Sequence, residues 1–137
     1  MRTVTRFLLG LLAIFLLIQF IPIIRTNPDD RRHPGTSPEV TEVLRRACYD
    51  CHSNETVWPW YSYVAPVSWL ITNDVEHGRH HFNLSNFEDL SDETKVKVRD
   101  AAKQLVREDK MPLWFYLPLH PEARLSERDR AIIESWK

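Results

Sequence analysis

The sequence predicts an all-α protein made of an N-terminal membrane helix, a linker and one helical domain. Three observations lead to this fold class. A run of 18 apolar residues, interrupted only by Gln19 and Pro22, occupies positions 7–24. Four later segments begin at Ser or Pro and repeat apolar residues with the period of a helix. Both cysteines of the chain stand together in one Cys-x-x-Cys-His motif, directly after the first of these segments.

We expect residues 1–24 to form an uncleaved signal anchor with a transmembrane helix. At about 1.5 Å per residue the apolar run is ~27 Å long as a helix, which matches the hydrocarbon core of a bilayer. Arg2 and Arg6 precede it, as in an export signal, and no Ala-x-Ala cleavage site follows it. Residues 25–36 contain turn-forming Asn-Pro and Pro-Gly pairs, and we expect them to be a linker.

Residues 37–137 form the predicted helical domain. Ser37, Ser91 and Ser126 each precede an apolar-periodic segment, so we expect each of them to cap the N-terminus of a helix. A further helix is expected over residues 66–76. Its expected buried face carries four aliphatic residues: Val67, Leu70, Ile71 and Val75.

The motif formed by Cys48, Cys51 and His52 is the pattern of c-type haem attachment. Two thiols at this spacing can each add across one vinyl group of the porphyrin, and the next residue then lies under the iron. Neutral imidazole is a good iron ligand, so His52 is the expected proximal ligand. We therefore expect one covalent haem c, attached through Cys48 and Cys51.

Other uses of two cysteines at this spacing are open. A dithiol redox pair usually accompanies a βαβ pattern, which this sequence lacks. A zinc site usually needs four protein ligands, and the chain has no second Cys-x-x-Cys. A plain structural disulfide is compatible with the spacing.

A second axial ligand is expected from Met111. It is the only methionine besides Met1, and Pro112 holds its backbone out of helix. His/Met ligation is typical of electron-transfer haems and raises the reduction potential. His77 is the alternative distal ligand, and a purely space-filling role for Met111 also fits the sequence.

Three further residues are candidates for contacts with the porphyrin. Trp58 and Trp60 lie in an aromatic-rich stretch and are expected to pack on it, although ordinary core packing also explains such residues. Residues 77–81 contain three histidines, and we expect a loop there, near the haem. Arg79 in this loop is a candidate partner for a haem propionate. A separate metal site would need a carboxylate or thiol to complete it.

At this point the sequence resembles a known family, the bacterial haem-binding domain proteins (Haem_bd), which are small exported proteins with a c-type cytochrome motif. The resemblance extends over nearly all of residues 37–137, and its motifs occur in a specific order. They are Cys48-Tyr49-Asp50-Cys51-His52-Ser53-Asn54, Trp58-Pro59-Trp60-Tyr61, His77-Gly78-Arg79, Met111-Pro112, His120-Pro121-Glu122-Ala123-Arg124-Leu125-Ser126 and Trp136. Leu84 and Phe87 depart from the usual family pattern, which concerns local packing only. The resemblance implies haem c binding and assigns no reaction.

The expected protein is a cytochrome c-like domain on one membrane anchor at the bacterial cytoplasmic membrane. We place the domain in the periplasm, because covalent haem attachment in bacteria occurs outside that membrane. Its expected work is one-electron transfer with redox partner proteins that the sequence does not name, rather than catalysis. Two other functions are open. The first is a haem protein with a displaceable sixth ligand, which serves as an enzyme accessory or as a sensor of gas or redox state. The second is a haem-free thiol-redox protein. The net charge of −1 argues against nucleic-acid binding.

Overall fold

The computed structural model describes residues 2–30 and 32–137, and over these residues it consists of helices and turns without a strand. The predicted all-α class is therefore confirmed. In chain order the elements are α1 (Arg2–Ile18), α2 (Pro38–Ala47), α3 (Tyr49–His52), η1 (Trp60–Tyr63), α4 (Val67–His81), η2 (Leu84–Asp89), α5 (Asp92–Arg107), η3 (Pro121–Ala123) and α6 (Glu127–Glu134).

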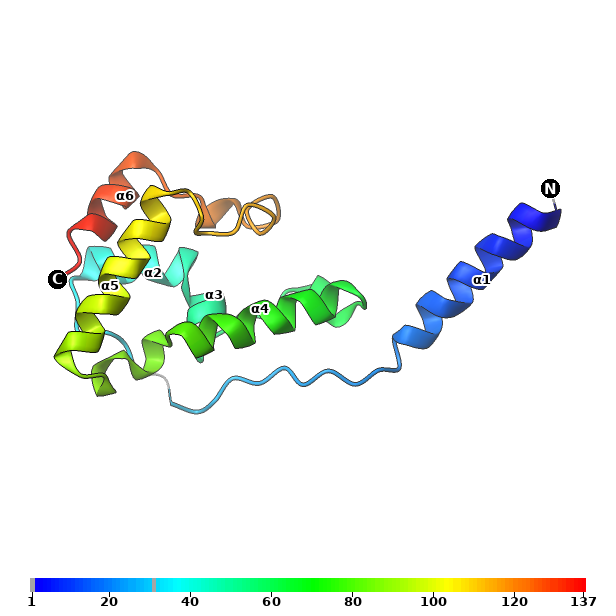
Figure 1. The fold of residues 1–137 in the computed structure, drawn as a ribbon, viewed down its shortest axis with the longest axis horizontal. Helices are drawn as coiled ribbons and strands as arrows, with labels where there is room; N and C mark the ends of the chain where they lie inside the picture. The colour runs from blue at the N-terminus through cyan, green and yellow to red at the C-terminus, as the bar shows by residue number, and fades with distance from the viewer. Residues whose placement is uncertain (1, 31) are drawn as a thin grey trace.

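Helix α1 stands apart from the other helices, and an extended segment joins it to them (Figure 1). It begins at Arg2 and ends at Ile18, so it covers only part of the helix predicted over residues 7–24. Pro22 has no backbone N–H with which to continue a helix, and the chain already turns before reaching it. Within residues 2–30 and 32–137, no helix combines the length and the apolar character that a membrane crossing needs. The predicted transmembrane helix is thus not found.

The three predicted N-caps are confirmed. The side chains of Ser37, Ser91 and Ser126 each accept a hydrogen bond from a backbone N–H in the first turn of α2, α5 and α6, respectively. Ser126 and Asp129 form a complete capping box, in which each side chain accepts from the backbone N–H of the other residue. These local signals fix where each helix begins.

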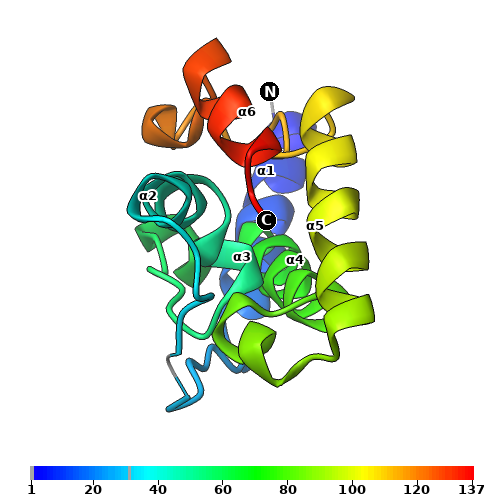
Figure 2. The ribbon, with the colours of Figure 1, turned by 90° about the vertical axis from the view of Figure 1, so that its left-hand side faces the viewer.

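The hydrophobic core lies where α2, α5 and α6 meet. Helix α6 contacts both of the others, and Figure 2 shows α2 and α5 on opposite sides of the domain. The short helix η2 also reaches this core, since Phe87 packs on Trp136 with ring centroids 5.4 Å apart. The buried apolar residues are Val40, Val43, Leu44, Tyr49, Leu84, Phe87, Val106, Ile133 and Trp136. Each such side chain contributes about 1.5–3 kcal/mol of burial free energy, and together they anchor the helix that ends at the motif.

Helix α4 is longer than predicted, and only part of its predicted buried face turns inward: Val75 is buried and Ile71 is partly buried. It continues through His81, so the loop expected over residues 77–81 was wrong. Val67 and Leu70, which we expected to be buried, are 42% and 48% exposed. Helix α3 packs so closely against α4 at Gly78 that a Cβ there would clash with the backbone of Cys51. The buried residues of α4 are Ser68, Thr72, Val75 and Gly78.

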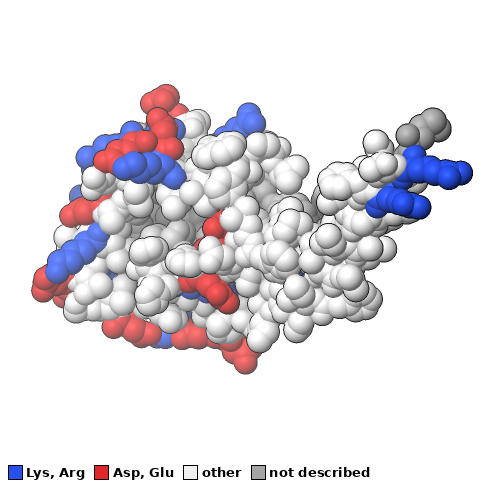
Figure 3. Space-filling view, turned by 45° about the vertical axis from the view of Figure 1, so that its right-hand side comes forward, with Lys and Arg blue, Asp and Glu red and all other residues white. Residues whose placement is uncertain are grey.

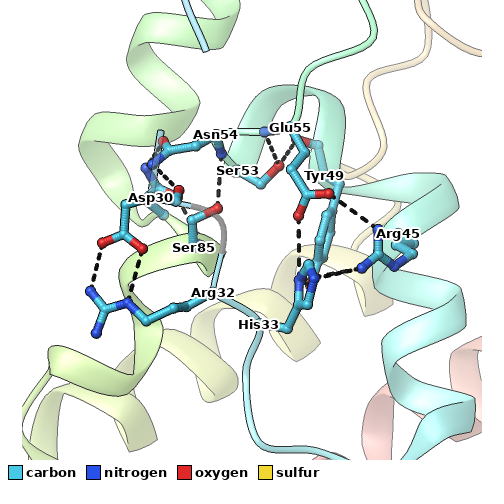
Figure 4. Close-up of polar contacts among 10 residues, drawn as sticks. Asp30, Arg32, His33, Arg45, Tyr49, Ser53, Asn54, Glu55 and Ser85 are labelled. Atoms are coloured by element: carbon cyan, nitrogen blue, oxygen red, sulfur yellow. Dashed lines mark hydrogen bonds and ion pairs between the residues drawn. The ribbon is translucent and has the colours of Figure 1, made fainter. Parts of the chain in front are cut away.

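The segment before α2, predicted to be a linker, lies along the helical domain and makes polar contacts with it (Figure 4). The Asp30 carbonyl accepts from Asn54 Nδ2 at 2.7 Å. The ring of His33 stacks on Tyr49 of α3, with centroids 5.9 Å apart. Arg32 Nη1 donates to Asp89 Oδ1 at 2.6 Å. The loop that follows the motif is therefore braced from outside by the chain that precedes α2.

Candidate functional site

A cavity of about 280 Å³ lies between the motif, helix α4 and the chain after α5. Cys48, Cys51, His52 and Met111 all line it, although Met111 is 59 residues away from His52 in the sequence. The structure thus brings together the four residues that were predicted to attach and ligate one haem. The remaining apolar lining is formed by Ala47, Val57, Pro59, Ile71, Val75, Pro112, Leu113 and Phe115.

The two cysteines are held at the junction of α2 and α3. Cys48 N donates to Leu44 O at 2.8 Å and closes α2, and both thiols are free. Burial raises the pKa of Cys48 and of Cys51 to about 12. Dithiol oxidoreductases depend on a lowered thiol pKa. This environment is therefore unlike that of a dithiol oxidoreductase.

The imidazole of His52 is oriented by helix α4. Its Nδ1 lies 2.9 Å from Gly78 O and 3.3 Å from Phe82 O, and because carbonyls only accept, Nδ1 carries the proton. The ring also stacks on Phe82, with centroids 4.0 Å apart and planes 9° from parallel. Burial lowers the pKa of His52, which favours the neutral ring. Nε2 therefore has the free lone pair that iron ligation requires.

Both candidates for the distal ligand border the cavity. Met111 is partly buried, and its N–H donates to Leu105 O at 3.2 Å. His77 is exposed on α4, with Nδ1 2.8 Å from Asn73 O. His81, one turn further along the same helix, lines the cavity as well. Among the residues that the structure describes, no group of three His, Cys, Asp or Glu side chains could hold a separate metal ion.

Three predicted contact residues lie outside the cavity lining. Trp60 is 76% exposed, and Trp58 is partly buried elsewhere. The Arg79 guanidinium joins the chain before α2 to the loop after α3. It donates to Thr26 O, Asn27 Oδ1, Ser53 O and Thr56 Oγ1 at 2.7–2.9 Å. The lining contains no Lys or Arg, so its basic side chains are the imidazoles of His52, His77 and His81.

Sequence reasoning missed a polar group in the cavity wall. Tyr116 Oη donates to Asp50 Oδ2 at 2.6 Å, and Tyr61 Oη lies 2.5 Å from His120 Nε2. Burial, together with the bond to Asp50, raises the pKa of Tyr116 and keeps its phenol protonated. Asp50, Tyr61 and His120 lie within motifs that carry the family resemblance, which is the signal that could have singled them out. Tyr116 gave no such signal.

Comparison with known proteins bears directly on this cavity. A family model described as a haem-binding domain, Haem_bd, matches residues 13–137. No curated protein and no solved structure matches the chain. The donor set fits such a group, because an apolar cavity carries two free thiols, a neutral imidazole with Nε2 free and a thioether.

Proposed function

The chain belongs to the Haem_bd family of haem-binding domains, and from this premise we propose that it binds its haem covalently and transfers single electrons. The observation that carries the proposal is the meeting of Cys48, Cys51, His52 and Met111 around one apolar cavity. When bound, the haem supplies an iron that alternates between the ferrous and ferric states and so carries one electron.

Each residue has a distinct part in this proposal. The thiols of Cys48 and Cys51 would hold the haem through thioether bonds, each thiol adding across one vinyl group, and the junction of α2 and α3 sets their positions. His52 supplies Nε2 to the iron. The Gly78 carbonyl accepts a hydrogen bond from Nδ1–H, which fixes the ring and raises its basicity. Met111 supplies a thioether from the opposite chain segment, and such a soft ligand favours ferrous iron and a higher reduction potential.

An electron carrier fits this arrangement better than a catalyst does. If His52 and Met111 both ligated the iron, a substrate would have to displace one of them. The largely apolar lining would limit the contact of the haem with water, an environment that suits a one-electron carrier. A sensor or an accessory to an enzyme would require Met111 to be displaced easily, and the ligand-binding experiments described below measure that directly.

Covalent attachment is tested by extraction. Produced together with a c-type haem maturation system, the protein should retain its haem after denaturation in acid and organic solvent. Cys48→Ala combined with Cys51→Ala should release it. His80→Ala is a matched control, because His80 is exposed on α4 and does not line the cavity. Haem that extracts freely from the unmodified protein would refute the proposed attachment.

We further propose that the domain works in the bacterial periplasm and rests against the cytoplasmic membrane through α1. Support comes from the side chains of α1, because apolar residues on every side of this helix are exposed, from Val4 to Leu17. Figure 3 adds that the face of the molecule beside α1 carries few charged side chains. The protein should sediment with membranes, and protease added to spheroplasts should digest it. Recovery in the cytoplasmic fraction, protected from that protease, would refute this location.

A further inference from the structure

The chain between α5 and η3 forms one wall of the cavity without being a helix. Met111, Pro112, Leu113, Phe115 and Tyr116 all line the cavity from this side. The wall segment, residues 111–120, is joined to α5 at its start by the bond from Met111 N to Leu105 O, and its other backbone hydrogen bonds are short-range turns such as Tyr116 N to Leu113 O and His120 N to Leu117 O. Such turns shape the part after Met111 but do not place it against the rest of the domain, so the position of that part depends on side chains.

Two phenol hydroxyls join the wall segment to the opposite side of the cavity. Tyr116 Oη donates to Asp50 Oδ2 at 2.6 Å, and Asp50 lies between the two attachment cysteines. The other oxygen of that carboxylate accepts Val57 N–H at 2.9 Å, so the acceptor is itself held in place. Tyr61 Oη, from η1, reaches His120 Nε2 at 2.5 Å.

The two bonds are coupled through a stacked pair of rings. Tyr116 lies on the imidazole of His120 with centroids 3.9 Å apart and planes 6° from parallel. His120 Nδ1 is 3.0 Å from Glu122 Oε1, and a carboxylate only accepts. Nδ1 therefore carries the proton, and Nε2 accepts a hydrogen bond from the hydroxyl group of Tyr61. Breaking either bond loosens a ring that supports the other bond.

We propose that Tyr61 and Tyr116 are positioning residues that hold the wall segment closed over the haem and so limit the access of outside ligands to the iron. The part of this inference that concerns ligand access to the iron rests on the proposed function. The closure of the wall segment by the two tyrosines does not depend on haem. Both hydrogen bonds exist only when the wall segment is closed, so their loss shifts the balance between the closed and open arrangements.

The expected effects follow from the kind of bond. A hydrogen bond to a charged group corresponds to a factor of about ten to one hundred in an equilibrium, and a neutral bond to about fivefold. Tyr116→Phe should therefore increase the affinity of the ferric haem for imidazole by roughly tenfold or more, and Tyr61→Phe by about fivefold. In the double variant, the increase in imidazole affinity should be smaller than the product of the increases in the two single variants, because the stacked rings couple the two hydrogen bonds.

The test titrates imidazole into the haem-loaded full chain and follows the absorption spectrum. Tyr63→Phe is the matched control, because Tyr63 is an exposed neighbour whose ring contacts Arg25. If Tyr61→Phe and Tyr116→Phe both bind imidazole as Tyr63→Phe does, the inference is overturned. Two independent variants keep the test decisive if one of them fails to fold.

Hydrogen exchange separates this inference from the proposed function. Amide protection of the wall segment should fall in Tyr116→Phe and in Tyr61→Phe, with or without haem, while protection in α2 should not change. If haem is not covalently retained but this loss of protection is seen, the proposed function fails and the positioning role stands. If haem is retained and protection is unchanged in both variants, the positioning role is refuted.

Discussion

Replacing Gly78 with alanine tests the packing that places His52. Gly78 lies on the buried face of α4, and a Cβ at this position would be 2.4 Å from Cys51 O and 2.9 Å from Cys51 C. Both are backbone atoms, so neither can rotate out of the way. Helix α4 would have to move by about 1 Å to restore an ordinary contact distance.

The energetic cost can be worked out from two opposing effects. Overpacking of a well-packed site costs about 1–3 kcal/mol, and a clash with backbone belongs in the upper part of that range. Alanine recovers about 1 kcal/mol through its higher helix propensity. The net loss in the free energy of unfolding is therefore about 1–2 kcal/mol. For a domain of about 100 residues this lowers Tm by roughly 5–15 °C.

The same displacement affects the site. Moving α4 lengthens the hydrogen bond from His52 Nδ1 to Gly78 O, which is 2.9 Å in the structure. A weaker bond makes the imidazole a poorer donor to iron, so we expect the reduction potential to rise. Thermal melts followed by circular dichroism and a redox titration measure the two effects. Gly10→Ala is the control, because a Cβ at that helical position meets nothing within 4 Å. A Gly78→Ala protein that melts at or above the wild-type temperature would refute the reasoning.

Two further predictions concern the distal ligand and the response to acid. Met111→Ala should open the iron to carbon monoxide, and Met111→His should keep six ligands and lower the reduction potential. His77→Ala should leave the absorption spectrum nearly unchanged. If His77→Ala opens the iron and Met111→Ala does not, the haem has two histidine ligands. Bonding to Arg46, with Nη2 2.5 Å from Oδ1, lowers the pKa of Asp129 from 3.8 to about 2. The carboxylate therefore contributes its full stability above about pH 4 and loses it as pH falls toward 2. Arg46→Gln should remove this part of the acid sensitivity in urea unfolding at pH 2–5, and an unchanged profile would contradict it.

Local chemistry explains which predictions succeeded. Ser37, Ser91 and Ser126 were identified as N-caps because a cap is made by groups only a few residues apart. The buried faces of α2 and α6 likewise follow from helical periodicity. Periodicity failed for α4, where the large residues Val67 and Leu70 face outward. At Gly78 the close approach of Cys51 leaves no room for a side chain, and no pattern within α4 reveals that approach.

The sequence by itself determined the all-α class, the starts of α2, α5 and α6 and the haem motif, because each depends on residues that are close along the chain. Only the tertiary structure decided how the cavity is enclosed. The hydrogen bond between Asp50 and Tyr116 joins residues that are 66 positions apart in the sequence. The hydrogen bond between His52 and Gly78 joins residues that are 26 positions apart. Such pairs depend on how the helices pack, and packing is settled by the shape of all side chains at once. That is also why Arg79 joins two segments of the chain outside the cavity lining.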